Sequence, residues 1–351
     1  MERVKIGIIG AGMAWEKLHH PAFQRLADQF SIEAICDKNM EKARNAAHMA
    51  GLGPERAYDS YQIMLNSVEV DAVDILVPIE ETYEVARDVL GHKKHLIVEK
   101  PVAATLSGAK ELAKLCKKVK MLVAENYRYN EENKIIKNLI DEKAIGSPIQ
   151  FLDVNMSDFQ QEKQSKSEFA STEWRQHPDF KGGIFLDSGV HHMARSRFLF
   201  GDIVKVYAVG RKAPKGFSQS PYSCINAMIT FKNGICGQYS YCCVSNETQM
   251  PPVGLRIYGT QGEIFLEDKE CGFVNFTTKN GDHQAIPYKP NEGYFNELIN
   301  FYEAIENDAP IVATPEKGCG DIQIIFDILK SIETESAIEY SVKRASREAA
   351  K

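Results

Sequence analysis

The stretch that decides the fold is Val4-Lys5-Ile6-Gly7-Ile8-Ile9-Gly10-Ala11-Gly12-Met13-Ala14-Trp15. Its apolar first half predicts a buried strand, and a glycine-rich turn follows before a predicted helix. Gly10 permits the tight turn, and Gly12 lets the backbone approach a pyrophosphate at the positive end of the helix. This order indicates a dinucleotide-binding turn, and we include Met13 and Ala14 among its expected cofactor-binding residues.

The turn departs from the usual pattern at its third small residue, where this chain has Trp15. Either the helix lies farther from the sheet, or Ala14 takes over the close packing. The alternative to a cofactor site is a purely structural corner between a strand and a helix.

The first 124 residues alternate apolar runs with amphipathic stretches, which is the pattern of a parallel sheet covered by helices. Short β-branched runs suit strands that are buried on both faces. The predicted strands are Val4–Ile9, Ile32–Cys36, Ala72–Val77, His95–Glu99 and Met121–Ala124, and the predicted helices are 16–29, 40–50, 82–91 and 107–117.

After residue 124 strands predominate, and consecutive strands without intervening helices predict an antiparallel sheet. Asn233-Gly234 predicts a type I′ hairpin turn, and the polar segment 159–172 predicts a surface loop or lid. The predicted strands are Ile149–Asp158, Val204–Gly210, Ser223–Phe231, Cys236–Val244, Gly254–Gly259 and Glu263–Glu267, and the predicted helices are 131–143, 292–307, 315–336.

The fold class is therefore α/β, with two domains. We expect an N-terminal Rossmann dinucleotide-binding domain over 1–124 and a C-terminal α+β domain over 125–351. The second domain is built on a large, mostly antiparallel open sheet, and its last helices can pack back on the first domain.

Asp37 ends the second predicted strand, 25 residues after Gly12. An acidic side chain at this place accepts hydrogen bonds from the adenosine ribose hydroxyls and repels a 2′-phosphate, which favours NAD over NADP. The neighbouring Lys38 can soften that preference, so NADP stays possible. The structural alternative is a solvated aspartate in a turn.

Glu99-Lys100-Pro101 follows the fourth predicted strand, at the sheet edge where open α/β folds bind ligands. With the other motifs of the chain, it resembles the Gfo/Idh/MocA family of glucose–fructose oxidoreductase and inositol dehydrogenase. The shared motifs are Gly10-x-Gly12, His19-His20-Pro21-Ala22, Asp71-Ala72-Val73, Pro78, Glu99-Lys100-Pro101, Glu125-Asn126-Tyr127-Arg128-Tyr129, Trp174-Arg175, Gly182-Gly183-x-x-x-Asp187-x-Gly189-x-His191 and Gly259-Thr260-x-Gly262.

The resemblance implies an NAD(P)-dependent oxidoreductase that acts on a secondary alcohol or carbonyl of a sugar, polyol or related small molecule. It implies catalytic roles for Lys100, Asp187 and His191. Pro78, Glu99, Lys100 and Asn126 are the further cofactor-binding residues that we expect. The chain departs from the family pattern at Thr82 and Ala194, and both positions bear on the pocket and hence on the substrate.

Asp187 and His191 are four residues apart and share one face of a helix if this segment is helical. A carboxylate beside an imidazole fixes its tautomer and tunes it as a general base, so we expect Asp187 to orient His191. Lys100 can hydrogen-bond the same substrate oxygen and stabilise developing negative charge. The alternative is a structural pair, and we expect no metal because no zinc-enzyme ligand spacing is present.

Lys100, Asp187 and His191 are also expected to contact the substrate. Trp174-Arg175 can form a stacking wall with a polar clamp, and Arg128 can line the same pocket. The alternative for Arg128, Trp174 and Arg175 is a contact between domains.

Composition narrows the classes of function. The chain of 351 residues has 42 Lys and Arg, 48 Asp and Glu, and a net charge of −6, which argues against nucleic-acid binding. No apolar run approaches a membrane span, and Glu2 together with the glycine-rich apolar run argues against a signal peptide. Eight scattered cysteines predict free thiols in a reducing compartment, so we expect a cytoplasmic protein.

Two other classes of function remain open. One is a non-catalytic dinucleotide-binding regulator, and the other is a lyase or hydrolase with tightly held NAD. Apolar residues on both faces of the strands 223–231 and 236–244 predict an interface, so we expect a homodimer or homotetramer through the C-terminal sheet.

Overall fold

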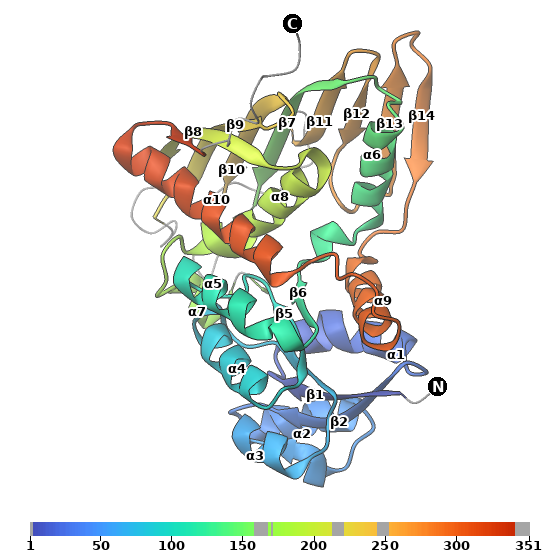
Figure 1. Cartoon of the computed structure of the whole chain (residues 1–351), viewed down its shortest axis with the longest axis vertical. Helices are drawn as coiled ribbons and strands as arrows, with labels where there is room; N and C mark the ends of the chain where they lie inside the picture. The colour runs from blue at the N-terminus through green and yellow to red at the C-terminus, as the bar shows by residue number, and fades with distance from the viewer. Residues whose placement is uncertain (1–2, 158–167, 170, 213–220, 244–252, 341–351) are drawn as a thin grey trace, which may run out of the picture. The chain divides into compact units, whose positions relative to one another are not determined.

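The computed structural model describes residues 3–157, 168–169, 171–212, 221–243 and 253–340. They form two compact units (Figure 1), the first with Met1–Glu131, Thr172–Ala194 and Asn291–Gln323, the second with Glu132–Ser171, Arg195–Pro290 and Ile324–Lys351. Each unit combines separate parts of the chain, and the domain boundary at residue 124 stays a prediction. Most of the predicted lid 159–172 lies outside the described residues, as do the predicted strand ends Asp158 and Val244.

The first unit contains a six-stranded parallel sheet in the order β3-β2-β1-β4-β5-β6, which is the Rossmann order. The α/β fold class is thus confirmed. Strand β3 was not predicted, because two residues give no hydrophobic run. The strands are β1 (Val4–Ile9), β2 (Phe30–Cys36), β3 (Ala57–Tyr58), β4 (Ala72–Ile75), β5 (His95–Glu99) and β6 (Met121–Ala124).

Helices cover both faces of this sheet, and Figure 1 shows α4 beside α5 and α9 beside α1. Short turns of 3-10 helix lie at Pro54–Arg56, Cys116–Lys118 and Asn126–Arg128. The helices of the first unit are α1 (His20–Arg25), α2 (Met40–Met49), α3 (Tyr61–Ser67), α4 (Ile79–Gly91), α5 (Leu106–Leu115), α7 (Glu173–Gln176) and α9 (Gly293–Glu306).

The segment after the glycine turn differs from the single helix predicted over 16–29. A π-helical turn at Trp15–His19 precedes the short α1. Trp15 is fully buried, and its ring lies 5.0 Å from that of His20 and 6.3 Å from that of Phe23. The wide turn therefore begins at the large indole that replaces a small residue of the usual pattern.

The second unit is built on a nine-stranded sheet in the order β14-β13-β12-β11-β7-β10-β9-β8-β15. Its described pairs are antiparallel except β7 with β10, which is parallel, so the mostly antiparallel open sheet is confirmed. The strands are β7 (Pro148–Met156), β8 (Ile203–Arg211), β9 (Cys224–Phe231), β10 (Cys236–Cys242), β11 (Gly254–Gly259), β12 (Gly262–Leu266), β13 (Phe273–Thr278), β14 (His283–Pro287) and β15 (Ile338–Glu339).

Three helices begin in one unit and end in the other, namely α6 (Glu131–Asp141), α8 (Ile184–Phe200) and α10 (Pro315–Thr334). Helix α8 carries the predicted catalytic pair Asp187 and His191, and the condition that this segment be helical is met.

The two faces of the second sheet differ in polarity. On β9 and β10 the side chains of Ile225, Ile229 and Tyr239 are fully buried. On the opposite face Asn226 and Ser240 hydrogen-bond each other across the strands, at 2.7 Å. The expectation of an apolar set on both faces is therefore only partly right. The large apolar side chains that are exposed on β8 and β9 are Tyr207, Val209 and Met228.

The hairpin between β9 and β10 is not a type I′ turn. Gly234 has a positive φ of 93°, but Asn233 is not among the residues with positive φ. The Asn233 side chain instead accepts a hydrogen bond from the Ile235 N–H and donates one to the Phe200 carbonyl. These two bonds favour a longer turn in which only the glycine is left-handed.

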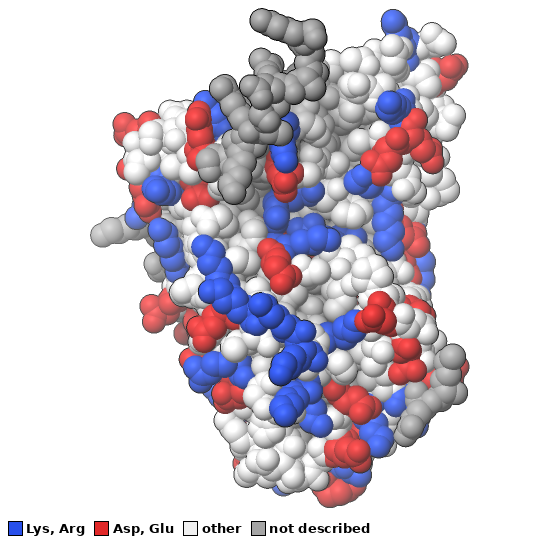
Figure 2. Space-filling view, viewed as in Figure 1, with Lys and Arg blue, Asp and Glu red and all other residues white. Residues whose placement is uncertain are grey.

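The surface of the first unit carries a row of basic side chains over α5 and the turn after it (Figure 2). Lys110, Lys114 and Lys118 are four residues apart, and with Lys117 all are exposed. No helix among the described residues has the length and hydropathy that crossing a membrane requires.

Candidate active site

The glycine turn at the end of β1 has the shape that a dinucleotide needs. Gly10 has φ +105°, and a Cβ there would lie 2.4 Å from the Leu76 carbonyl oxygen, so no other residue fits. A Cβ on Gly12 would meet no atom within 4 Å. The backbone of the turn therefore packs closely against the sheet at Gly10, whereas the space beside Gly12 is open. The helix begins beside that open space with Met13 and Ala14, which are both half-buried.

Asp37 at the end of β2 braces this turn. Its Oδ2 accepts the Ala11 N–H at 2.9 Å, and its Oδ1 accepts the Asn39 N–H at 2.9 Å. The carboxylate therefore stands beside the glycine turn, at the position expected of a ribose-binding acid. Lys38 is exposed and pairs with Glu81 at 2.7 Å.

The backbone N–H groups of the turn, the Asp37 carboxylate and the free space at Gly12 fit NAD. Backbone N–H groups at the start of a helix suit a pyrophosphate, and a carboxylate beside the turn suits ribose hydroxyls. Pro78 stands half-buried before α4, beyond the end of the adjacent strand β4, so it lies at the same sheet edge.

Lys100 follows β5 and is held by the start of α8. Its Nζ donates to the Asp187 Oδ1 and to the Asp187 carbonyl oxygen, both at 2.9 Å. Arg175 Nε donates to the Asp187 Oδ2 at 2.7 Å. Burial alone would raise the pKa of Asp187, but Lys100 and Arg175 hold it well below its usual range.

His191 has a partner other than the one predicted. Its Nδ1 lies 2.7 Å from the Glu125 Oε1, and the Tyr127 ring stacks on the imidazole at 4.6 Å. The expectation that Asp187 orients His191 is wrong, because both carboxylate oxygens of Asp187 serve Lys100 and Arg175. Glu125 supplies the orienting carboxylate, and its place directly after β6 is the signal that could have identified it.

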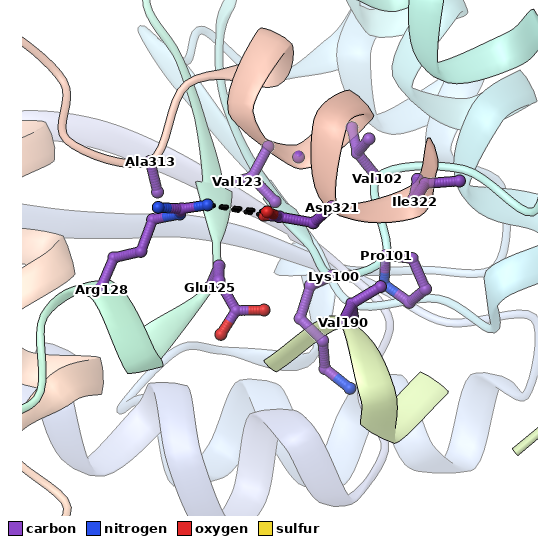
Figure 3. Close-up of a pocket in the computed structure, with 11 residues that line it drawn as sticks. Lys100, Pro101, Val102, Val123, Glu125, Arg128, Val190, Ala313, Asp321 and Ile322 are labelled. Atoms are coloured by element: carbon purple, nitrogen blue, oxygen red, sulfur yellow. Dashed lines mark hydrogen bonds and ion pairs between the residues drawn. The ribbon is translucent and has the colours of Figure 1, made fainter. Parts of the chain in front are cut away.

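Lys100 and Glu125, the carboxylate partner of His191, both line one pocket (Figure 3). Figure 3 shows Arg128 facing Asp321 inside it, and Arg128 Nη2 donates to both Asp321 oxygens at 2.8 and 2.9 Å. Arg128 is almost fully buried. Its ion pair with Asp321 neutralises its charge inside the pocket. The lining residues are Lys100, Pro101, Val102, Val123, Glu125, Arg128, Val190, Ala313, Gly318, Asp321 and Ile322.

Trp174 and Asn126 lie beside this constellation. The Arg175 guanidinium sits 4.0 Å from the centre of the Trp174 ring, so one arginine contacts both the indole and Asp187. Asn126 is buried, and its Oδ1 has no hydrogen-bond partner within the described part of the chain. A contact of either residue with a ligand stays a prediction.

Two family models match the chain in sequence order. Residues 4–127 match the NAD-binding Rossmann fold of the GFO_IDH_MocA oxidoreductase family, and residues 137–340 match its C-terminal alpha/beta domain. The chain belongs to the Gfo/Idh/MocA family. It is therefore an NAD(P)-dependent oxidoreductase, and residues 4–127 form its NAD-binding Rossmann fold.

Known proteins match this Gfo/Idh/MocA chain over nearly its whole length. Uncharacterized protein YMR315W of Saccharomyces cerevisiae is 28% identical over 94% of this chain and 96% of its own. The 1,5-anhydro-D-fructose reductase of Ensifer adhaerens is 24% identical over 88% and 91%. The crystal structure of an oxidoreductase from Thermotoga maritima has a TM-score of 0.84 and 26% identity, and the match covers 96% of this chain and 98% of that one.

The two departures from the Gfo/Idh/MocA pattern are both buried. Thr82 lies within α4, where its hydroxyl donates to the Pro78 carbonyl at 3.2 Å. Ala194 lies on α8, one turn after Val190. Thr82 thus makes an intrahelical bond.

The open space at Gly12 gives a direct test of the cofactor site. We expect Gly12→Val to fold normally and to weaken NADH binding by about a hundredfold or more, because its side chain would fill space left for the pyrophosphate. NADH fluorescence measures the affinity and thermal unfolding measures the fold. Gly91→Val is the matched control, since a Cβ there also meets no atom within 4 Å. Normal NADH affinity in Gly12→Val would place the cofactor elsewhere.

Proposed function

We propose that the protein is a dehydrogenase or reductase that transfers hydride between NAD and a secondary alcohol or carbonyl of a sugar, polyol or related small molecule. The observation that carries this proposal is that one pocket is lined both by Lys100 and by Glu125, the carboxylate that binds the imidazole of His191. The similarity to 1,5-anhydro-D-fructose reductase supports a sugar-like substrate.

His191 is the proton acceptor in this proposal. Because Glu125 accepts the Nδ1–H, the neutral ring carries its lone pair on Nε2. Nε2 makes no hydrogen bond to any of the residues that the structure describes, and it is the atom that takes the hydroxyl proton when an alcohol is oxidised. In the reducing direction the same nitrogen returns the proton to the new alkoxide.

Lys100 stabilises the substrate oxygen. Two acceptors on Asp187 hold its ammonium, and an ammonium has three N–H donors, so one donor remains for a substrate oxygen. A cation placed there favours the alkoxide that develops as the proton leaves. NAD, when bound, supplies the hydride chemistry by accepting hydride at the nicotinamide ring and, once reduced, returning it.

Asp187, Arg175 and Trp174 complete the substrate side of the proposal. Asp187 fixes Lys100 and Arg175 in one orientation, and the indole under the guanidinium gives an apolar wall on which a sugar face can stack. The contact of Arg128 with substrate proposed from the sequence is an indirect one, since Asp321 already holds its guanidinium.

The experiment that tests this function is a screen of sugars and polyols with NAD and with NADP, following the absorbance of the reduced nicotinamide. We expect turnover with at least one such alcohol and a preference for NAD, because the Asp37 carboxylate beside the turn repels a 2′-phosphate. Binding of NADH without turnover of any substrate would favour the regulator. A change in substrate without net NADH production would favour the lyase or hydrolase.

The acid–base roles predict distinct losses. We expect His191→Ala and Lys100→Ala each to lower kcat by about 10²-fold or more, as for loss of a positioned acid–base group. NADH binding should survive in His191→Ala, which is measured by fluorescence titration. Glu125→Gln should lower kcat less than His191→Ala, because the amide still accepts from Nδ1–H. Near-normal turnover of His191→Ala would assign the proton to another group.

We also propose a homodimer or homotetramer that associates through the exposed face of the second sheet. Tyr207 and Met228 face each other across β8 and β9, and with Val209 they are between 42% and 54% exposed. Such a patch usually marks an interface. A cytoplasmic location stays a prediction from the cysteines.

Light scattering at micromolar concentration tests this association. We expect a multiple of the 39.4 kDa chain mass, and Met228→Asp combined with Tyr207→Asp should shift the particle toward that mass, because two charges would be buried in the interface. Ile63→Asp is the control, because Ile63 is equally exposed but lies on α3 of the first unit. A 39.4 kDa particle for the unaltered chain would rule out the homo-oligomer.

A further inference from the structure

His19 is a buried histidine with a carboxylate at each ring nitrogen. Its Nδ1 lies 2.8 Å from the Asp74 Oδ2, and its Nε2 lies 3.2 Å from the Glu99 Oε1. The side chain is 1% exposed, Asp74 is fully buried and Glu99 is 15% exposed. Because Asp74 is on β4 and Glu99 ends the neighbouring β5, the imidazole links two adjacent strands at the edge where the catalytic groups lie.

With Asp74 and Glu99 both ionised, this geometry requires a charged ring; burial raises the pKa of Asp74, and the charge and hydrogen bond of His19 act against that rise. A neutral imidazole has one N–H, so its other nitrogen would direct a lone pair at a carboxylate oxygen. Asp74 depends on His19, because its Oδ1 has no hydrogen-bond partner among the described residues. Burial would lower the pKa of His19, but Asp74 and Glu99 raise it well above the usual value.

Helix α9 packs against this cluster with one tyrosine and one glutamate. Tyr294 and Glu297 of α9 face it, and the Tyr294 ring lies 5.9 Å from that of His19. Both Glu297 oxygens are buried without a hydrogen-bond partner in the described structure. Burial raises the pKa of Glu297 well above its usual range; the charge of His19 lowers it, and the nearby carboxylates raise it further.

Glu99 connects His19 to the catalytic lysine. Its Oε1 contacts His19, and its Oε2 accepts the backbone N–H of Lys100 at 3.0 Å. Burial would raise the pKa of Glu99, but the hydrogen bond from His19 and the charges of His19, Lys100 and His191 lower it. The carboxylate is therefore ionised, and it holds the peptide that carries Lys100.

We propose that His19 is a positioning residue of the active site, a buried imidazolium that clamps Asp74 and Glu99 and through Glu99 fixes the backbone from which the Lys100 ammonium reaches Asp187. Its effect on turnover rests on the proposed function, whereas its effect on Lys100 does not. The effect of His19 on Lys100 can therefore be measured without a substrate, as the chemical reactivity of the Lys100 amine.

The first test measures how accessible the Lys100 amine is. The variant is His19→Gln combined with Asp74→Asn, which removes the imidazolium together with the carboxylate that would be left unpaired in the core. We expect acylation of Lys100 by a succinimidyl ester, quantified by peptide mass spectrometry, to become several-fold faster at unchanged thermal stability. His20→Gln is the matched control, because burial lowers the pKa of that neighbouring ring and it is uncharged at neutral pH.

Two further measurements complete the test. In the unaltered protein, ¹⁵N spectra should show both His19 ring nitrogens protonated at pH 8, and a neutral ring would overturn the clamp. With a sugar or polyol that the protein turns over, the double variant should lose about tenfold to a hundredfold in kcat with the NADH affinity unchanged, as expected for a displaced catalytic group.

The outcomes separate the two proposals. If the double variant has the Lys100 reactivity and the stability of the unaltered protein, His19 has no positioning role. If it has normal kcat although Lys100 is more reactive, the fixed backbone is not needed for turnover and the proposal is equally overturned. If the double variant does not fold, Glu99→Gln supplies the same reactivity measurement. Absence of any substrate would contradict the proposed function and leave the reactivity result standing.

Discussion

The proposed active site depends on one buried carboxylate that two cations share. Asp187 accepts from Lys100 on one oxygen and from Arg175 on the other, so a residue of α8 fixes a lysine that follows β5 and an arginine of α7. Removing two cations and an anion from water is costly unless every donor and acceptor is used. Here that requirement sets the orientation of the Lys100 ammonium before any substrate arrives.

Three carboxylates from different strands lie at the same edge of the parallel sheet. Asp37, Glu99 and Glu125 stand at the carboxyl ends of β2, β5 and β6, because parallel strands bring those ends to one side. Each carboxylate is tied to a donor from another part of the chain: Asp37 to a backbone N–H of the glycine turn, Glu99 to His19, and Glu125 to His191. These bonds allow three carboxylates to lie at one edge of the sheet, each with its own donor.

Sequence patterns predicted the features that obey local rules. The glycine turn, Asp37 and the five main strands of the first sheet follow from periodicity and from the left-handed backbone that only glycine adopts readily. The partner of His191 could not be predicted in this way. Spacing along one helix suggested Asp187 as that partner. In the structure the Asp187 carboxylate binds Lys100 and Arg175, which come from distant segments of the chain, and His191 binds Glu125 instead.

Two further differences have similar causes. The π-turn at Trp15 follows from packing a large indole against His20 and Phe23, which a helical period does not reveal. Strands β13 and β14 were missed because Phe273–Thr278 does not alternate strictly between apolar and polar residues and His283–Pro287 is mostly exposed. In the second sheet the parallel pairing of β7 with β10 joins residues about 86 positions apart, counted from Gln150 to Cys236, and short-range patterns do not contain such pairings.

The two edge strands of the nine-stranded sheet, β14 and β15, bear on whether another chain can add a strand to it. An edge strand presents unpaired N–H and C=O groups, and natural proteins keep such edges short, polar or interrupted by proline. Here one outer strand, β15, has two residues, and the other, β14, begins at His283 and ends at Pro287. Among the described residues neither outermost strand offers a long apolar ladder, which disfavours edge-to-edge pairing, and the proposed contact between copies uses the sheet face instead.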